Sequence, residues 1–389
     1  MTAKFNFDKP IDRRNTASMK WDRYRGTDIL PMWLADMDFQ SPPEVMAAIR
    51  NRVDHGVFGY SRPPEELTEI TLNLLKQRYD WTVKRHWLVW LPGLVTGINV
   101  SCRAVGQRDD DVMTAIPVYP PFLTAPGFNE RTLTTVPLTE NEMNWTINFD
   151  KLEQAVTPRT RLFLLCNPHN PVGRVFTSDE LRRLGAFCKK HDLVICSDEI
   201  HCDLILDPAK THFPTAVLDP EAADRTITLM APSKTYNIAG LGCSFAVISN
   251  VSLRERFKTA MAGLIPDVNI LAFIAADAAY HHGEPWRRAV IEYLRSNRDI
   301  VIQAVNAMPG LDIKPIEATY LAWIDTRRAG IQHPAAFFEK AGVGLNNGQD
   351  FGGPGFVRLN FGCPRATLET GLGRMAAAMA TRTNHKGLH

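Results

Sequence analysis

The chain has 389 residues, of which 45% are hydrophobic and 22% charged, a composition typical of a globular protein. Its 44 basic and 42 acidic residues nearly cancel, so the charge gives no indication of a nucleic-acid partner. At about 100–200 residues per domain, the length predicts two or three domains.

The sequence also carries no sign of export or membrane insertion. Residues 1–14 alternate apolar and charged side chains and lack the apolar core of a secretory signal. No apolar stretch approaches the roughly 20 residues that span a bilayer, so we expect no membrane partner. The seven cysteines form no C-x-x-C pair, which favours a reducing compartment and a cytoplasmic protein.

The first two thirds of the chain alternate short apolar runs with amphipathic segments. Residues 92–95 are typical of a strand end that opens a helix, and residues 177–191 of a helix with Thr177 or Ser178 as N-cap. Buried strands are predicted at residues 161–166, 193–196, 225–230 and 243–249. This alternation predicts a mostly parallel sheet with helices on both faces.

The last third has a different pattern. A long amphipathic helix is predicted over residues 285–308, strands over 320–324 and 357–361, and a final helix over 366–380 with a frayed end from about residue 381. A glycine-rich stretch, residues 342–355, lies between the two strands. We therefore expect a large α/β domain of residues 46–284 and a smaller α+β domain of residues 1–45 and 285–389.

Polar side chains follow three of the predicted strands. Asn170 follows the first, Asp198 and His201 the second, and Ser233 and Lys234 the third. Because ligands gather at the carboxyl ends of parallel strands, these side chains should share one site. Burial beside an apolar strand would favour the neutral, nucleophilic form of the Lys234 amine. The alternative is a solvated loop lysine.

Several motifs occur in a specific order along the chain. They are MWLADMDF at residues 32–39, HGVFGYSR at 55–62, NPHNPVG around Asn170, SDEIH around Asp198, APSKTYNIAGL around Lys234 and FVRLNFGCPR around Arg358. In this order the chain resembles the aminotransferase-like, fold-type I enzymes that depend on pyridoxal 5′-phosphate. More narrowly, it resembles their cystathionine β-lyase branch of the MalY/PatB type. The resemblance extends from about residue 12 to residue 379 and implies a large domain with a mostly parallel seven-stranded sheet between helices.

The resemblance also implies residue roles. Lys234 would be the catalytic residue and would hold the cofactor as a Schiff base, and Asp198 would pair with the pyridinium nitrogen. The other implied cofactor contacts are Gly93, Leu94, Val95, Tyr119, Asn170, His201, Ser233 and, from the neighbouring subunit of a homodimer, Tyr60. The implied substrate contacts are Arg358, Asn170, Ala35 and Tyr119. We expect no metal site.

Each assignment has a structural alternative. Asp198 could cap a helix, Asn170 could serve a turn before Pro171, and Tyr119 could be an ordinary core aromatic. Arg358 could be a surface ion-pair partner, and His201 could be a core histidine.

Two positions distinguish a lyase from a transaminase. His201 stands where typical aminotransferases carry tyrosine, and Gly242 stands where they carry an arginine for the phosphate. Both departures match the lyase branch, which implies elimination of a thiol, such as homocysteine from cystathionine in methionine biosynthesis, with pyruvate and ammonia. Cystine and other S-substituted cysteines fit equally well. A class I/II aminotransferase and a cofactor-binding regulator without turnover are the alternatives.

Overall fold

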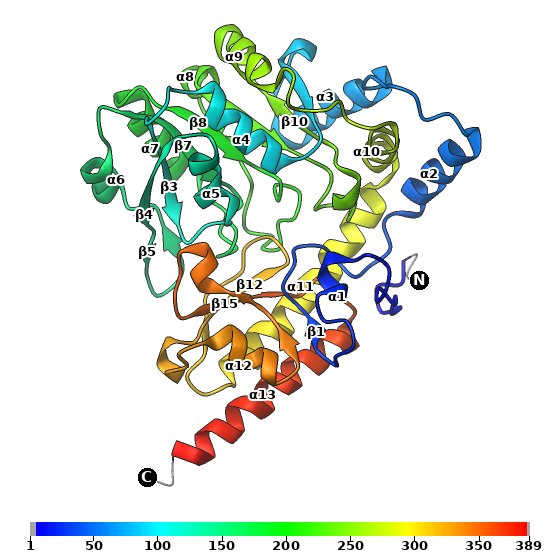
Figure 1. Cartoon of the computed structure of the whole chain (residues 1–389), viewed down its shortest axis with the longest axis vertical. Helices are drawn as coiled ribbons and strands as arrows, with labels where there is room; N and C mark the ends of the chain where they lie inside the picture. Colours follow the sequence, from blue (N-terminus) through cyan, green and yellow to red (C-terminus); the bar gives the residue numbers. More distant parts are fainter. Residues whose placement is uncertain (1–4, 387–389) are drawn as a thin grey trace.

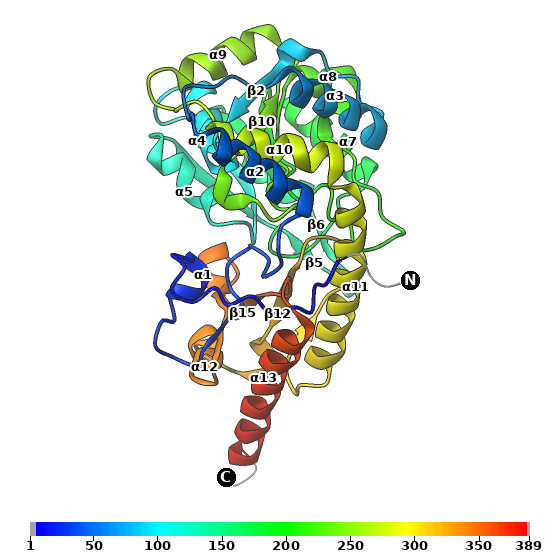
Figure 2. The ribbon, with the colours of Figure 1, turned by 90° about the vertical axis from the view of Figure 1, so that its right-hand side faces the viewer.

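A computed structural model describes residues 5–386 and shows two lobes (Figure 1). The upper lobe is built around a large sheet and the lower lobe around a small one. Helix α11 (Glu284–Asn306) starts beside the upper lobe and continues along the lower one, as Figure 2 shows from the side. The end residues of the smaller predicted domain, 1–4 and 387–389, lie outside the described residues.

The large sheet has seven strands in the order β2-β10-β9-β8-β7-β3-β4. All neighbours are parallel except β10, which is antiparallel to both β2 and β9. The predicted mostly parallel, seven-stranded sheet is therefore confirmed. The strands are β2 (Leu88–Leu91), β3 (Asp111–Ile116), β4 (Thr132–Pro137), β7 (Thr160–Cys166), β8 (Val194–Asp198), β9 (Thr226–Met230) and β10 (Ser244–Val247).

Helices cover both faces of this sheet. One apolar core joins it to α4 (Leu94–Ala104), α5 (Pro121–Phe128) and α9 (Val251–Met261). Cores on the other face include α6 (Phe149–Ala155), α7 (Ser178–Lys190), α3 (Glu65–Tyr79) and α10 (Ile270–His282). Thr177, one of the two N-cap residues that the sequence allows, caps α7 and forms a capping box with Glu180. The helices α2 (Pro43–His55) and α8 (Pro220–Asp224) complete this lobe.

The lower lobe contains an antiparallel sheet in the order β11-β12-β15-β14. The N-terminal part of the chain joins this lobe, because β1 (Leu30–Pro31) pairs with β13 (Val343–Gly344). The sheet strands are β11 (Asp312–Ile313), β12 (Leu321–Asp325), β14 (Asn346–Asn347) and β15 (Phe356–Asn360). Shorter elements are α1 (Met19–Asp22), α12 (Pro334–Lys340), β5 (Thr139–Glu140) and β6 (Trp145–Thr146).

The last helix, α13, spans Arg365–Lys386, so the expectation of a frayed end from about residue 381 is wrong as far as residue 386. The Thr381 hydroxyl donates to the Ala377 carbonyl, and the Arg382 guanidinium donates to the Ala329 and Gly330 carbonyls. The first bond lies within the helix, and the bonds of Arg382 tie the end of the helix to the lobe. None of the described helices is both long enough and apolar enough to cross a lipid bilayer.

Candidate active site

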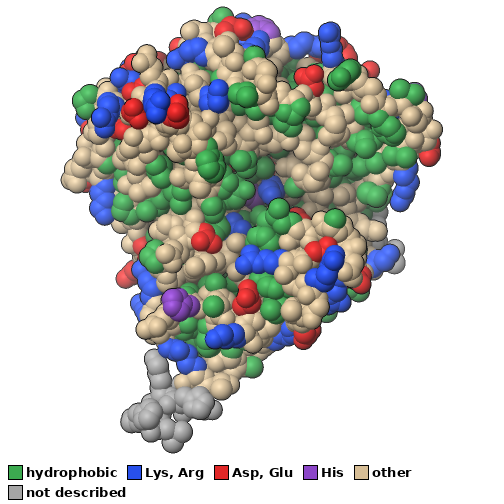
Figure 3. All heavy atoms as spheres, in the orientation of Figure 1, with side chains coloured by type: hydrophobic (Ala, Val, Ile, Leu, Met, Phe, Trp, Pro, Cys, Tyr) green, Lys and Arg blue, Asp and Glu red, His purple; other side chains and the backbone are tan. Residues whose placement is uncertain are grey.

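A cavity of about 250 Å³ lies at the carboxyl ends of β7, β8 and β9, where the two lobes meet. Figure 3 shows a hollow between the lobes with basic side chains inside it. Every sequence-predicted site residue except Tyr60 lines the cavity, namely Ala35, Gly93, Leu94, Val95, Tyr119, Asn170, Asp198, His201, Ser233, Lys234 and Arg358. Residues 188 positions apart along the chain, such as Asn170 and Arg358, thus become direct neighbours.

Lys234 stands on the turn after β9 and faces the cavity, not bulk solvent. Its Nζ donates to the Ala35 carbonyl at 2.6 Å. Burial lowers the Lys234 pKa to about 8, although the carboxylates of Asp36 and Asp198 act in the opposite direction. At a pH of about 8, roughly half of the Lys234 amine is therefore unprotonated and nucleophilic.

Asp198 ends β8 and is 4% exposed. Its Oδ1 accepts from the Ile200 backbone N–H at 3.1 Å, but no helix begins there, so helix capping does not account for this residue. Burial raises the Asp198 pKa to about 7, and no ion pair of the described residues includes it. A buried carboxyl without a cation fits the pyridinium nitrogen of the expected cofactor.

Arg358 lies in the middle of β15 and is 3% exposed, so it is not a surface ion-pair partner. Its guanidinium donates to Asn170 Oδ1 at 2.9 Å, to Asn346 Oδ1 at 2.7 Å and to the Trp33 carbonyl at 3.0 Å. Its Nε is buried without a partner, and none of the described carboxylates forms an ion pair with the group. Burial lowers the Arg358 pKa to about 10. A substrate carboxylate could therefore form the ion pair that this guanidinium lacks.

His201 is buried at the cavity wall. Burial and the nearby cations Lys234 and Arg358 lower its pKa to about 3, so the ring is neutral at physiological pH. Its Nδ1 has no hydrogen-bond partner among the described residues, and its ring meets the Tyr320 ring edge-on at 5.9 Å. A neutral imidazole ring can still form a hydrogen bond with a cofactor or substrate atom.

The cavity lining also offers neutral donors for a phosphate. The first backbone N–H groups of α4, those of Leu94, Val95 and Thr96, have no acceptor within their own helix, and the helix dipole adds positive potential there. The Ser233 hydroxyl lines the same cavity. Gly242 has a φ of +72°, and a Cβ there would lie 2.7 Å from the Pro92 carbonyl oxygen. This position therefore cannot hold an arginine in the present backbone. The donor set fits a phosphate bound by amides and a hydroxyl.

Four residues next to the cavity were not predicted from the sequence. Tyr320 donates its hydroxyl to the Ala35 carbonyl at 3.0 Å, and Asn346 holds Arg358. Asn237 and Asn360 bind the backbone around Ala35. Asn237 lies three residues after Lys234, and Asn360 lies two residues after Arg358, each within the same sequence motif. This closeness to a predicted site residue was the one sequence feature that could have indicated them.

Tyr60 is the one predicted residue that the single chain does not bring to the cavity. It lies fully exposed in the segment after α2. Four exposed apolar side chains precede it in the sequence: Met46, Val53, Val57 and Phe58.

Comparisons with known proteins identify the family of the chain. The family described as aminotransferase class I and II matches residues 29–375. The chain is 37% identical to cystathionine β-lyase PatB of Bacillus subtilis (strain 168), over 96% of this chain and 100% of that protein. The crystal structure of OvoB is 47% identical with a TM-score of 0.94, covering 96% of this chain and 99% of that one. A PLP-bound C–S lyase from Staphylococcus hominis is 35% identical with a TM-score of 0.91, covering 97% and 99%. The chain therefore belongs to the aminotransferase class I and II family, whose members use pyridoxal phosphate (PLP) as cofactor.

Proposed function

We propose that the protein is a PLP-dependent carbon–sulfur β-lyase. It would convert cystathionine or a related S-substituted cysteine to a thiol, pyruvate and ammonia. The printed names of PatB and of the Staphylococcus hominis enzyme support this reaction. The observation that carries it is the cavity that combines the Lys234 amine, a buried Asp198 without a cation and a buried Arg358 without a carboxylate.

Lys234 is proposed to attach the cofactor and then to act as the base. When bound, pyridoxal phosphate supplies an electron sink for the substrate α-carbon. An amine with a pKa of about 8 can accept the α-proton near physiological pH, a role worth about 10²–10⁴-fold in rate. Asp198 would keep the pyridine nitrogen protonated by pairing with it.

Substrate binding is assigned to four other residues of the cavity lining. Arg358 would bind the α-carboxylate through its guanidinium fork, and Asn170, whose oxygen is already engaged by Arg358, would present its amide nitrogen as a donor. Tyr119 and Ala35 would complete this wall. A thiol has a pKa of about 8.5, so it leaves more readily than an alcohol or an amine.

The phosphate would be bound by the Gly93, Leu94 and Val95 segment and by Ser233, with His201 near the ring oxygen. The closed space at Gly242 supports this assignment, because the arginine of typical aminotransferases has no room there. The lyase therefore remains the first candidate over an aminotransferase.

An aminotransferase is the second candidate, since the matching family carries that description. Purified protein supplied with cystathionine and no keto acid should release thiol and pyruvate in equal amounts. Amino transfer to an added keto acid, without pyruvate from cystathionine, would favour the second candidate. Cofactor binding with no turnover of either kind would favour a regulator.

Three further assignments complete the proposal. A homodimer would bring Tyr60 into the neighbouring subunit's site, and the exposed apolar side chains around Tyr60 support this interface. Residues 46–284 and residues 1–45 with 285–389 would be the two domains. A cytoplasmic location is supported by the seven cysteines, which are all buried and free.

A further inference from the structure

A short irregular segment, residues 32–39, crosses beside the cavity and contains Ala35. We call it the strap. The backbone carbonyl oxygens of six successive strap residues, 32–37, all accept hydrogen bonds from other parts of the chain. In irregular segments, backbone carbonyls usually bind water. Because these six bind other parts of the protein, their hydrogen bonds fix the path of the strap.

Asn360 holds the strap from the lower lobe. Its side chain is 1% exposed, and its Nδ2 donates to the Leu34 carbonyl at 2.5 Å and to the Asp36 carbonyl at 2.7 Å. Its backbone N–H donates to the Met32 carbonyl at 2.8 Å. Asn360 therefore binds the backbone carbonyls of the residues on both sides of Ala35.

Asn237 holds the strap from the turn that carries Lys234. Its Nδ2 donates to the Met37 carbonyl at 2.9 Å and to the Phe39 carbonyl at 2.7 Å, and its Oδ1 accepts from the Met37 N–H at 2.9 Å. Its φ is +55°, a left-handed conformation that asparagine tolerates better than most residues. The strap is thus tied directly to the segment of the reactive lysine.

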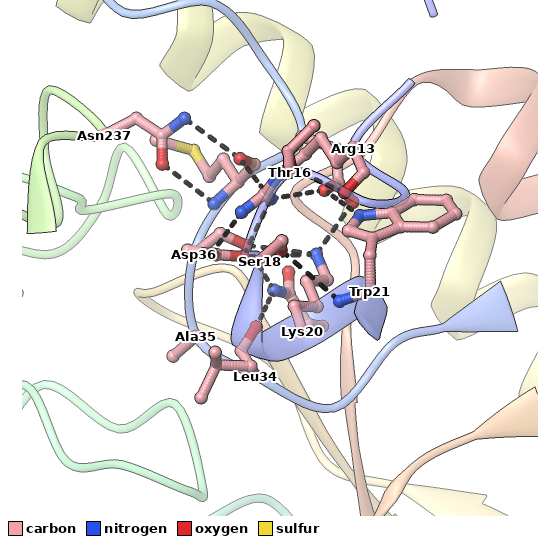
Figure 4. Close-up of polar contacts among 12 residues, drawn as sticks. Arg13, Thr16, Ser18, Lys20, Trp21, Leu34, Ala35, Asp36 and Asn237 are labelled. Atoms are coloured by element: carbon pink, nitrogen blue, oxygen red, sulfur yellow. Dashed lines mark hydrogen bonds and ion pairs between the residues drawn. The ribbon is translucent and has the colours of Figure 1, made fainter. Parts of the chain in front are cut away.

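Charged residues from the N-terminal segment hold the strap from another side, as Figure 4 shows. Lys20, 1% exposed, pairs with Asp38 at 2.7 Å. Arg13 pairs with Asp38 at 2.6 Å and with Asp36 at 2.7 Å. Two positive and two negative groups cancel, so this cluster anchors the strap and adds no net charge to the site.

We infer that Asn237 and Asn360 are positioning residues, which fix the strap so that the Ala35 carbonyl holds the Lys234 amine in the cavity. Within residues 5–386, that carbonyl is the only hydrogen-bond partner of Lys234 Nζ. The Tyr320 hydroxyl donates to the same oxygen and fixes it further. The inference rests on the proposed attachment of the cofactor to Lys234.

The step that depends on this placement is capture of the cofactor. The unprotonated amine nitrogen forms a C=N bond with the aldehyde carbon, and the aldehyde oxygen leaves as water with the two amine protons. Because a displacement of about 1 Å can cost roughly 10²-fold in rate, the strap should govern how fast the linkage forms.

Rapid mixing of cofactor-free protein with pyridoxal phosphate tests the inference. Asn237→Ala and Asn360→Ala should each slow the absorbance change of linkage formation by about tenfold or more. Their affinity for pyridoxamine 5′-phosphate, which fills the same site without forming the linkage, should be unchanged. A parallel loss of that affinity would mean that the whole site had collapsed, and would overturn the inference.

Asn297 offers a matched control. It is also buried, and its Nδ2 donates to two carbonyls just after β15, those of Phe361 at 3.0 Å and Cys363 at 2.9 Å, without touching the strap. Asn297→Ala should capture the cofactor at the wild-type rate. Equal slowing in this control, or wild-type rates in both strap variants, would overturn the inference.

Tyr320→Phe removes one hydrogen-bond donor from the Ala35 carbonyl with little change in side-chain volume. If an asparagine variant fails to fold, this substitution still tests whether the position of the Ala35 carbonyl controls cofactor capture. Slowed capture supports the inference, and a wild-type rate contradicts it. Borohydride trapping on the wild-type protein distinguishes a failure of the proposed cofactor attachment from a failure of the positioning inference. Label on another lysine would refute the proposed attachment itself, whereas label on Lys234 with unaltered variant rates would refute only the positioning.

Discussion

The amine of Lys234 and the carbonyl of Ala35, 199 residues apart in the chain, are joined by a hydrogen bond of 2.6 Å. This bond connects the turn after β9 with the strap, and both the lysine and Arg358 line the same cavity. Asp36, next to Ala35, acts through its charge to raise the Lys234 pKa, against the larger effect of burial.

Arg358→Ala should mainly impair substrate capture. Loss of a charge-assisted contact to the α-carboxylate, about 1.5–3 kcal/mol, should lower kcat/KM by roughly 10- to 100-fold, chiefly through KM. Steady-state kinetics with cystathionine measure the split. Arg327→Ala is the control, since Arg327 is half exposed and pairs with Asp325 outside the cavity. An unchanged KM in Arg358→Ala would remove this residue from substrate binding.

Asp198→Asn should make the cofactor-free protein more stable, and increasingly so as the pH rises. The folded-state pKa of Asp198 is raised from 3.8 to about 7, so between these values the folded state holds a proton that the unfolded state has lost. The free energy of unfolding therefore falls with rising pH through this window in the wild type and not in the variant. Between pH 5 and pH 8 the difference between the two proteins should grow by about 2–3 kcal/mol.

Urea unfolding of both cofactor-free proteins at the two pH values provides this difference. The titrations of His201 and Lys234 also affect stability, with pKa values lowered to about 3 and about 8. The subtraction removes the His201 contribution and leaves of the Lys234 contribution only the part that depends on the Asp198 charge. Asp150→Asn, at an exposed position, is the control substitution. If the difference in unfolding free energy between wild type and Asp198→Asn did not change with pH, the description of Asp198 as a buried carboxyl without a cation would be wrong.

Gly242→Ala should weaken cofactor binding. The added Cβ would lie 2.7 Å from the Pro92 carbonyl oxygen, and the left-handed backbone adds about 1–2 kcal/mol for any residue with a Cβ. The strain falls on the turn that leads into α4 and its free amides. Absorbance titration with pyridoxal phosphate should show a dissociation constant raised by about tenfold.

Gly240→Ala is the matched control for that substitution. Gly240 lies in the same loop, and a Cβ there meets no atom within 4 Å. It should bind the cofactor as the wild type does. Equal effects of the two substitutions would mean that the loop, and not the closed space beside Pro92, determines phosphate binding.

Much of the fold could be predicted because local signals agree with the tertiary structure. The buried run of β7 is followed by the capping box of Thr177 and Glu180, so both the strand and the start of α7 are visible in the sequence. The direction of β10 was not predictable in this way, because a short apolar run has the same hydropathy in either direction.

The polar residues of the site were predictable to the extent that they follow strands. Asn170, Asp198 and Lys234 meet because the carboxyl ends of β7, β8 and β9 lie together. The role of the strap was not predictable, since it acts through backbone carbonyls, which any residue type provides. The partners of those carbonyls, Asn237 and Asn360, come from the two lobes and meet the strap only after folding.

The most direct test of the account is to locate the linkage between protein and cofactor. The purified protein should absorb near the visible edge, and borohydride reduction followed by peptide mass mapping should place the pyridoxyl group on Lys234. Lys234→Ala should lose both the absorbance band and the label. A label on any other lysine, or a band that persists in Lys234→Ala, would contradict the account.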